Sequence, residues 1–152
     1  MKLLEPNFCF FSFTNYIVLK KKLKMADIKV SGRTKVKSFY NAFIKEFPYL
    51  HASLKYPDGK GVDMNASIAN ARAKSLGGEY SPTGNTALSI RGNLNIGTFE
   101  KRFQKEFSIT CEIHFMRENG RWAKTGKQYD AMTLNEASAK LKDDGAQKIE
   151  KI

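Results

Sequence analysis

Histidine, cysteine and tryptophan are scarce in this chain, which has two, two and one of them among 152 residues. Metal sites need clustered His, Cys, Asp or Glu side chains at ligand spacing, whereas His51 and His114 are single residues on the outward phase of two predicted strands. We therefore predict no metal site and no cofactor. Cys9 lies in an atypical leader and Cys111 at an inward strand position, so no disulfide framework is expected. This cysteine usage predicts a cytoplasmic protein.

The sequence signatures of common enzymes are also missing. The chain has no Gly-x-Gly-x-x-Gly, no phosphate loop ending in Gly-Lys-Ser/Thr and no Gly-x-Ser-x-Gly. Its carboxylates are scattered without an obvious acid–base pair, and Asp143-Asp144-Gly145 is too short for a calcium loop. We predict that the protein is not an enzyme and has no catalytic residue. Residues 143–152 are expected to form a solvated charged tail.

No apolar run is long enough to cross a bilayer, which takes about 18–20 residues. The longest candidate, residues 8–19, has 12 residues, three of them polar, and lysines follow it where a signal peptide needs small residues. Two interpretations of residues 1–24 remain open. We favour a non-native leader, with translation starting at Met25 and no membrane contact, over an interfacial anchor.

The most informative feature present is an internal repeat. Residues 28–47 align without a gap on residues 88–107, with six identical and four similar positions. The identical pairs are Gly32/Gly92, Phe39/Phe99, Phe43/Phe103, Lys45/Lys105, Glu46/Glu106 and Phe47/Phe107. Most of these positions are apolar or turn positions, so the duplication predicts architecture rather than chemistry.

Both copies show the same order of local patterns. Apolar residues spaced three and four apart predict a helix ending at Phe47 and at Phe107, and the strict alternation that follows each helix predicts a strand. A turn sequence then leads into a third short strand in each half. A last helix is expected over residues 63–74 and again over residues 130–142, where Thr133 and Glu136 fit a capping box.

These patterns predict an α+β fold of two tandem β-α-β-β-α repeats with pseudo-two-fold symmetry. A module of about 50 residues buries too little apolar surface to be stable alone, so the repeats should share one core and a mixed sheet. The expected segments are a leader, a first repeat, a linker, a second repeat and a tail, at residues 1–24, 25–76, 77–86, 87–142 and 143–152.

The chain as a whole carries more positive than negative charge. The full sequence carries 26 Lys and Arg against 15 Asp and Glu, and from Met25 onward 21 cations face 14 anions. Such an excess favours polyanionic partners. Ordinary solubility is an equally open explanation, because a net charge of this size is common.

The first repeat has a basic turn that the second repeat lacks. Arg33, Lys35 and Lys37 precede or open its first helix, where the second repeat has Asn93, Asn95 and Gly97. Each exposed cation at a helix N-terminus opposes the helix dipole by about 0.3–1 kcal/mol. A bound anion would relieve this conflict, although solvent and salt could also screen it.

The second repeat has a loop that is seven residues longer than its counterpart. Residues 117–129 hold four cations, two aromatic residues and two glycines. The candidate binding residues here are Arg117, Arg121, Trp122, Lys124 and Lys127. Basic and aromatic side chains together suit single-stranded nucleic acid, whose phosphates attract cations and whose bases stack on rings. Alternatively, Trp122 caps the core and the lysines are simply solvated.

These features predict a non-enzymatic nucleic-acid-binding protein, with RNA or single-stranded DNA favoured over a duplex. The basic turn and the basic-aromatic loop are its predicted binding residues. The alternative is a protein-interaction or assembly module that recruits a partner by adding a strand to an exposed sheet edge.

Overall fold

A computed structural model describes residues 27–77 and 87–152. The predicted leader, the predicted start at Met25 and residues 78–86 of the predicted linker lie outside the described residues. Within the described part, both halves follow the predicted order of strand, helix and strand and both finish in a helix. The elements of the first half are β1 (Asp27–Ser31), α2 (Val36–Glu46), β2 (His51–Lys55) and α3 (Ile68–Ser75).

The second half contains more secondary structure than the first. Its elements are β3 (Ala87–Arg91), α4 (Ile96–Phe107), β4 (Thr110–Met116), β5 (Trp122–Lys124), the short 3-10 helix η1 (Lys127–Tyr129) and α5 (Leu134–Asp143). The third strand predicted for the first half is wrong, because only a single bridge joins Lys55 to Gly61 there. The longer loop of the second half provides the extra residues from which β5 forms.

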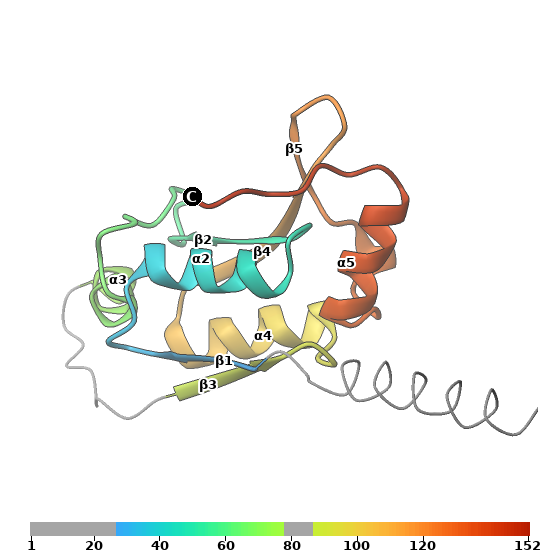
Figure 1. The fold of residues 1–152 in the computed structure, drawn as a ribbon. Helices are drawn as coiled ribbons and strands as arrows, with labels where there is room; N and C mark the ends of the chain where they lie inside the picture. The colour runs from blue at the N-terminus through green and yellow to red at the C-terminus, as the bar shows by residue number, and fades with distance from the viewer. Residues whose placement is uncertain (1–26, 78–86) are drawn as a thin grey trace, which may run out of the picture.

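The strands form two antiparallel sheets, so the prediction of a mixed sheet is wrong. β1 pairs with β3, and a second sheet has the order β2-β4-β5. A β-α-β unit with both strands in one sheet would be parallel. Here the strands that flank each helix belong to different sheets, and each pairs with a strand of the other half (Figure 1).

Helices α2 and α4 lie between the two sheets (Figure 1). Six fully buried phenylalanines, three from each helix region, form the centre of the core: Phe39, Phe43, Phe47, Phe99, Phe103 and Phe107. The ring of Phe39 contacts that of Phe103 at 5.4 Å between centroids, and Phe43 contacts Phe99 at 5.8 Å. One hydrophobic cluster therefore contains residues of both halves.

Each final helix begins several residues later than the sequence predicts. The preceding segment forms turns instead, and its carbonyls accept hydrogen bonds from the first turn of the Phe-bearing helix. The bonded pairs are Val36–Ala66 (3.0 Å), Lys37–Met64 (2.9 Å), Ile96–Met132 (3.0 Å) and Gly97–Asp130 (3.1 Å). Ser67 then caps α3, and Thr133 with Glu136 forms the predicted capping box of α5.

The charge pattern predicts that the C-terminal residues are solvated. This prediction is wrong for residues 147–152, which contact the rest of the fold. Ile149 is 5% exposed, and its N–H donates to the carbonyl of Pro48 at 2.8 Å. Burial of this isoleucine among charged residues helps to hold the segment, because it removes apolar surface from water. No helix in the described ranges is both long and apolar enough to cross a bilayer.

Candidate functional site

The basic-aromatic loop forms a hairpin that extends from the three-stranded sheet. Its turn closes through an N–H of Arg117 to the carbonyl of Arg121 at 2.9 Å and an N–H of Gly120 to the carbonyl of Arg117 at 2.8 Å. Gly120 has a φ of +81°, which favours glycine. Asn119 supports the turn by accepting from the Arg121 N–H at 3.0 Å. The local turn residues therefore hold Trp122 and Lys124 on a strand rather than on an irregular loop.

Trp122 does not cap the core. It is 46% exposed and lies on the face of β5 that points away from the helices, where its ring contacts that of His51 at 5.4 Å. The other aromatic residue of the loop, Tyr129, is buried. Of the two rings, only Trp122 offers a surface on which a base could stack.

The cations of the hairpin differ in whether a carboxylate lies close to them. Arg117, Arg121, Lys124 and Lys127 all have exposed side chains. The ammonium of Lys124, however, lies 3.4 Å from the carboxylate of Glu112 and is partly neutralised by it. The remaining three cations therefore carry most of the available positive charge.

The basic turn lies at the start of α2 and is solvent-exposed at all three predicted positions, Arg33, Lys35 and Lys37. Helix N-termini bind anions through free backbone N–H groups. Here the N–H groups of Val36 and Lys37 already donate to the segment before α3. Two of the N–H groups at this helix N-terminus are therefore not available to an anion.

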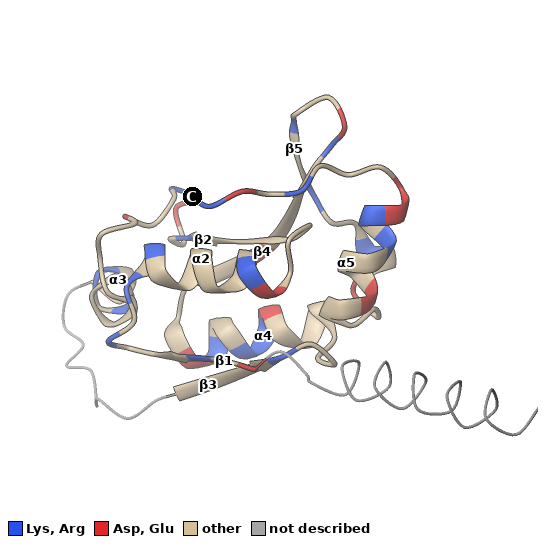
Figure 2. Ribbon diagram, in the orientation of Figure 1, with Lys and Arg blue, Asp and Glu red and all other residues tan. Residues whose placement is uncertain are grey.

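The two predicted groups of binding residues do not come together. The basic turn lies beside α3, where Lys35 bridges to Ser67, whereas the hairpin extends from β5 on the side of α5 (Figures 1 and 2). The basic turn and the hairpin therefore do not form one continuous surface, because they are not neighbours.

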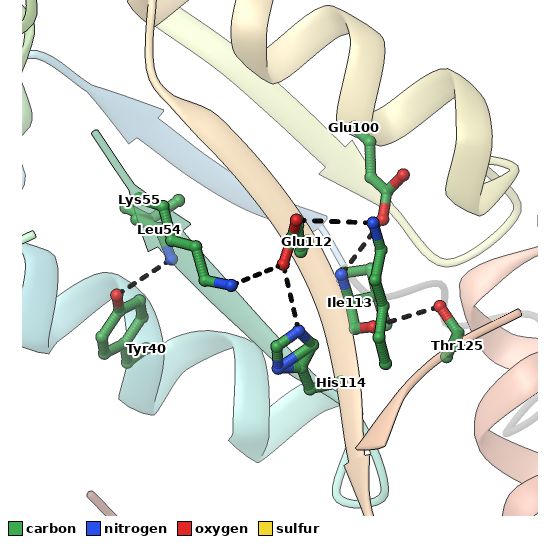
Figure 3. Close-up of polar contacts among 9 residues, drawn as sticks. Tyr40, Leu54, Lys55, Glu100, Glu112, Ile113, His114 and Thr125 are labelled. Carbon is green, nitrogen blue, oxygen red and sulfur yellow. Dashed lines mark hydrogen bonds and ion pairs between the residues drawn. The ribbon is translucent and has the colours of Figure 1, made fainter. Parts of the chain in front are cut away.

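Sequence reasoning missed a polar cluster on the outer face of the β2-β4-β5 sheet (Figure 3). Glu112 accepts from the Lys55 ammonium at 2.9 Å and contacts His114 Nε2 at 3.3 Å. The hydrogen bond from Lys55 is the main reason that the pKa of Glu112 is lowered. Lys55 and Glu112 are 57 residues apart, so no local sequence pattern reveals this pair.

Both histidines lie on the outward phase of their strands, as predicted, but both are half-buried. His51 and His114 are directly opposite one another in the β2-β4 pair. Burial is the main cause that lowers the pKa of His51 to about 4, with a smaller contribution from His114. Burial also lowers the pKa of His114 despite the nearby Glu112. The His114–Glu112 contact at pH 7 is therefore a hydrogen bond of a neutral imidazole.

No group of three His, Cys, Asp or Glu side chains in residues 27–77 and 87–152 is placed to hold a metal ion. The chain matches no protein-family model, no curated protein and no solved structure. Its function must therefore be inferred from its own residues.

Proposed function

We propose that this is a non-enzymatic, cytoplasmic protein that binds single-stranded nucleic acid, RNA or DNA, through the hairpin of residues 117–127. The observation that carries the proposal is the exposure of Trp122 between Arg121 and Lys124. A half-exposed indole on a rigid strand can stack on a base without reorganisation, and neighbouring cations can follow the phosphates. The overall positive charge favours association with the same ligand.

The alternative function is recruitment of a protein by strand addition. An added strand needs free N–H and C=O groups along a sheet edge. At the β2 edge, the Leu54 N–H already donates to the Tyr40 hydroxyl at 3.1 Å, and its carbonyl accepts from Val62. At the opposite edge, β5 has only three residues. These features favour nucleic-acid binding over strand addition in this sheet.

Salt dependence of binding tests the role of the hairpin cations. A triple variant, Arg117→Gln, Arg121→Gln and Lys127→Gln, should bind a labelled oligouridylate more weakly. Its slope of log affinity against log salt should flatten by about 0.7 for each phosphate that the protein no longer neutralises. Lys124 is left intact because its ammonium contacts Glu112, so its removal would also change the polar cluster around that carboxylate. A triple variant on exposed lysines elsewhere, Lys101→Gln, Lys105→Gln and Lys142→Gln, removes the same charge and is the matched control.

Unmodified protein that fails to bind the oligonucleotide near physiological salt would contradict the proposal. Equal reductions of affinity in the hairpin variant and in the control would also contradict it, because attraction would then depend on net charge alone. Fluorescence anisotropy at several salt concentrations provides the measurement.

Trp122 allows a second, independent test. Trp122→Ala should weaken binding by about 1–3 kcal/mol, the range for removal of a stacked ring, and leave the salt slope unchanged. Trp122→Phe retains a ring and should weaken binding less. Because Trp122 is 46% exposed, neither change should greatly lower the melting temperature. A normal affinity in Trp122→Ala would show that the indole does not contact the ligand.

We also propose that the two halves are tandem repeats related by a pseudo-two-fold axis. Aligned residues pair with one another across both sheets, Lys29 with Ser89 and Ser53 with Glu112. A residue can face its own counterpart across an antiparallel pair only where a two-fold axis passes between them. The reciprocal Phe39–Phe103 and Phe43–Phe99 contacts support the same axis. In this proposal the hairpin is an addition to one of two equivalent units.

A further inference from the structure

The segment of residues 147–152 folds back along the helix α2. The Gln147 N–H donates to the carbonyl of Met116 at 2.9 Å, and the Ile152 N–H donates to the side-chain oxygen of Asn41 at 3.0 Å. Between these points Ile149 is buried and bonded to Pro48. The segment is thus held at three places along its length.

A groove of about 550 Å³ lies between this segment and α2. Lys45 of α2 lines one side, and Lys148 and Lys151 line the other, with a single carboxylate from Glu150. All three lysines are exposed, and none forms an ion pair within the described part of the chain. The side chains that line the groove therefore carry a net positive charge, which suits an anionic ligand.

The isoleucines that line the groove are almost fully covered. Ile44 and Ile149 are each only 5% exposed. Because hydrophobic binding energy is proportional to the apolar surface removed from water, these residues have little left to contribute. The three exposed lysines are therefore the more specific feature of the groove, because they attract an anion.

The groove begins close to the hairpin. Met116 pairs with Trp122 of β5 on one side and with Gln147 on the other. Because neighbouring strands lie about 5 Å apart, the backbones of Trp122 and Gln147 are separated by about 10 Å. The Gln147 side chain also donates to the carbonyl of Glu118 in the hairpin turn at 2.7 Å. Figure 2 shows the segment running from the base of the hairpin toward α2 with lysines along it.

We infer that Lys45, Lys148 and Lys151 form a second phosphate-binding subsite, which holds the backbone of the same single strand whose base stacks on Trp122. This inference rests on the proposed function. It replaces the basic turn, which lies too far from the hairpin, with a nearer group of cations. Two of them, Lys148 and Lys151, were expected to lie in a solvated tail, and Lys45 belongs to α2. The groove receives phosphates, and the hairpin supplies the stacking ring.

A charge-removal experiment on the full chain tests this subsite. In the groove variant, Lys45→Gln, Lys148→Gln and Lys151→Gln are combined, and the Lys101/Lys105/Lys142 variant again serves as control, since Lys105 aligns with Lys45 on α4. We expect the groove variant to bind a long labelled oligouridylate several-fold more weakly than the control. Its salt slope should be lower by about 0.7 for each phosphate left without a lysine partner. Thermal melting of both variants checks that the fold is retained.

Oligonucleotide length provides the second measurement. A strand long enough to span hairpin and groove should be sensitive to the groove variant, whereas a dinucleotide should bind both proteins equally. If the groove variant binds the long strand as the control does while the hairpin variant is impaired, the subsite is wrong and the proposed function stands. If the unmodified protein binds neither strand near physiological salt, the proposed function fails and the subsite fails with it.

Discussion

At the scale of single residues, environment rather than residue type decides which side chains are available for binding. Trp122 and Tyr129 occur in the same loop, yet one is exposed and the other belongs to the core. Lys124 and Lys127 are both cations of this loop, but only Lys124 is held by Glu112. Composition therefore overstates the binding surface, because it counts residues that the fold uses for other purposes.

His51 should make stability depend on pH. Burial lowers its folded pKa to about 4, whereas an unfolded histidine has a pKa near 6.5. Between these values the unfolded chain binds more protons than the folded chain, so the free energy of unfolding falls as the pH is lowered from 7 to 5. The expected contribution of His51 is on the order of 2 kcal/mol over that range.

Urea denaturation at pH 7 and pH 5 measures this effect. His51→Phe keeps a ring beside Tyr40 and Trp122 but cannot be protonated. The variant should lose distinctly less stability than the unmodified protein on going to pH 5. Identical decreases in the two proteins would show that His51 is not protonated on unfolding. Residual pH dependence in the variant is expected, because burial also lowers the pKa of His114.

At the scale of elements, each Phe-bearing helix is tied to the strand that follows it by one side chain. Tyr40 of α2 accepts the Leu54 N–H at 3.1 Å, and Glu100 of α4 accepts the Ile113 N–H at 3.0 Å (Figure 3). Tyr40 and Glu100 are aligned positions in the two halves. The same structural task is thus performed by a phenol in one half and a carboxyl group in the other.

Tyr40→Phe should remove the acceptor and leave the Leu54 N–H unpaired at a buried strand position. An unsatisfied buried donor costs about 1–3 kcal/mol. Glu100→Gln retains an acceptor oxygen for Ile113 and should cost less, which makes it the matched comparison. Chemical denaturation of both variants gives the two values. A smaller destabilisation in Tyr40→Phe than in Glu100→Gln would contradict the role assigned to the Tyr40 hydroxyl.

At the scale of the whole molecule, the two halves depend on each other for their core. The Phe rings of α2 pack directly on those of α4, and every strand of the first half pairs with a strand of the second within the described residues. Neither half can retain its sheets if the other unfolds. The molecule should therefore unfold in one cooperative step.

Phe43→Ala and Phe103→Ala test both this cooperativity and the proposed symmetry. Both rings are fully buried at aligned positions, so each truncation should cost about 3–5 kcal/mol. Calorimetry should show a single transition at a lower temperature in each variant. Two separated transitions would mean independent halves, and a large cost at only one position would contradict their equivalence.

The type and order of most elements, and most residues of the core, are predictable from the amino-acid sequence. These features are encoded locally: a period of two marks a strand, spacings of three and four mark a helix face, and Thr133 with Glu136 marks a helix start. The phenylalanines, the buried Cys111 and the α+β class follow from such patterns.

Strand pairing and the contacts between distant residues depend on how the elements pack in three dimensions. Local periodicity does not specify strand partners, so two antiparallel sheets replaced the predicted mixed sheet. The Lys55–Glu112 contact and the hydrogen bond from the Ile149 N–H to the Pro48 carbonyl join segments that are distant in the chain. The separation of the basic turn from the hairpin has the same origin, because the distance between two surface groups depends on how the elements between them pack.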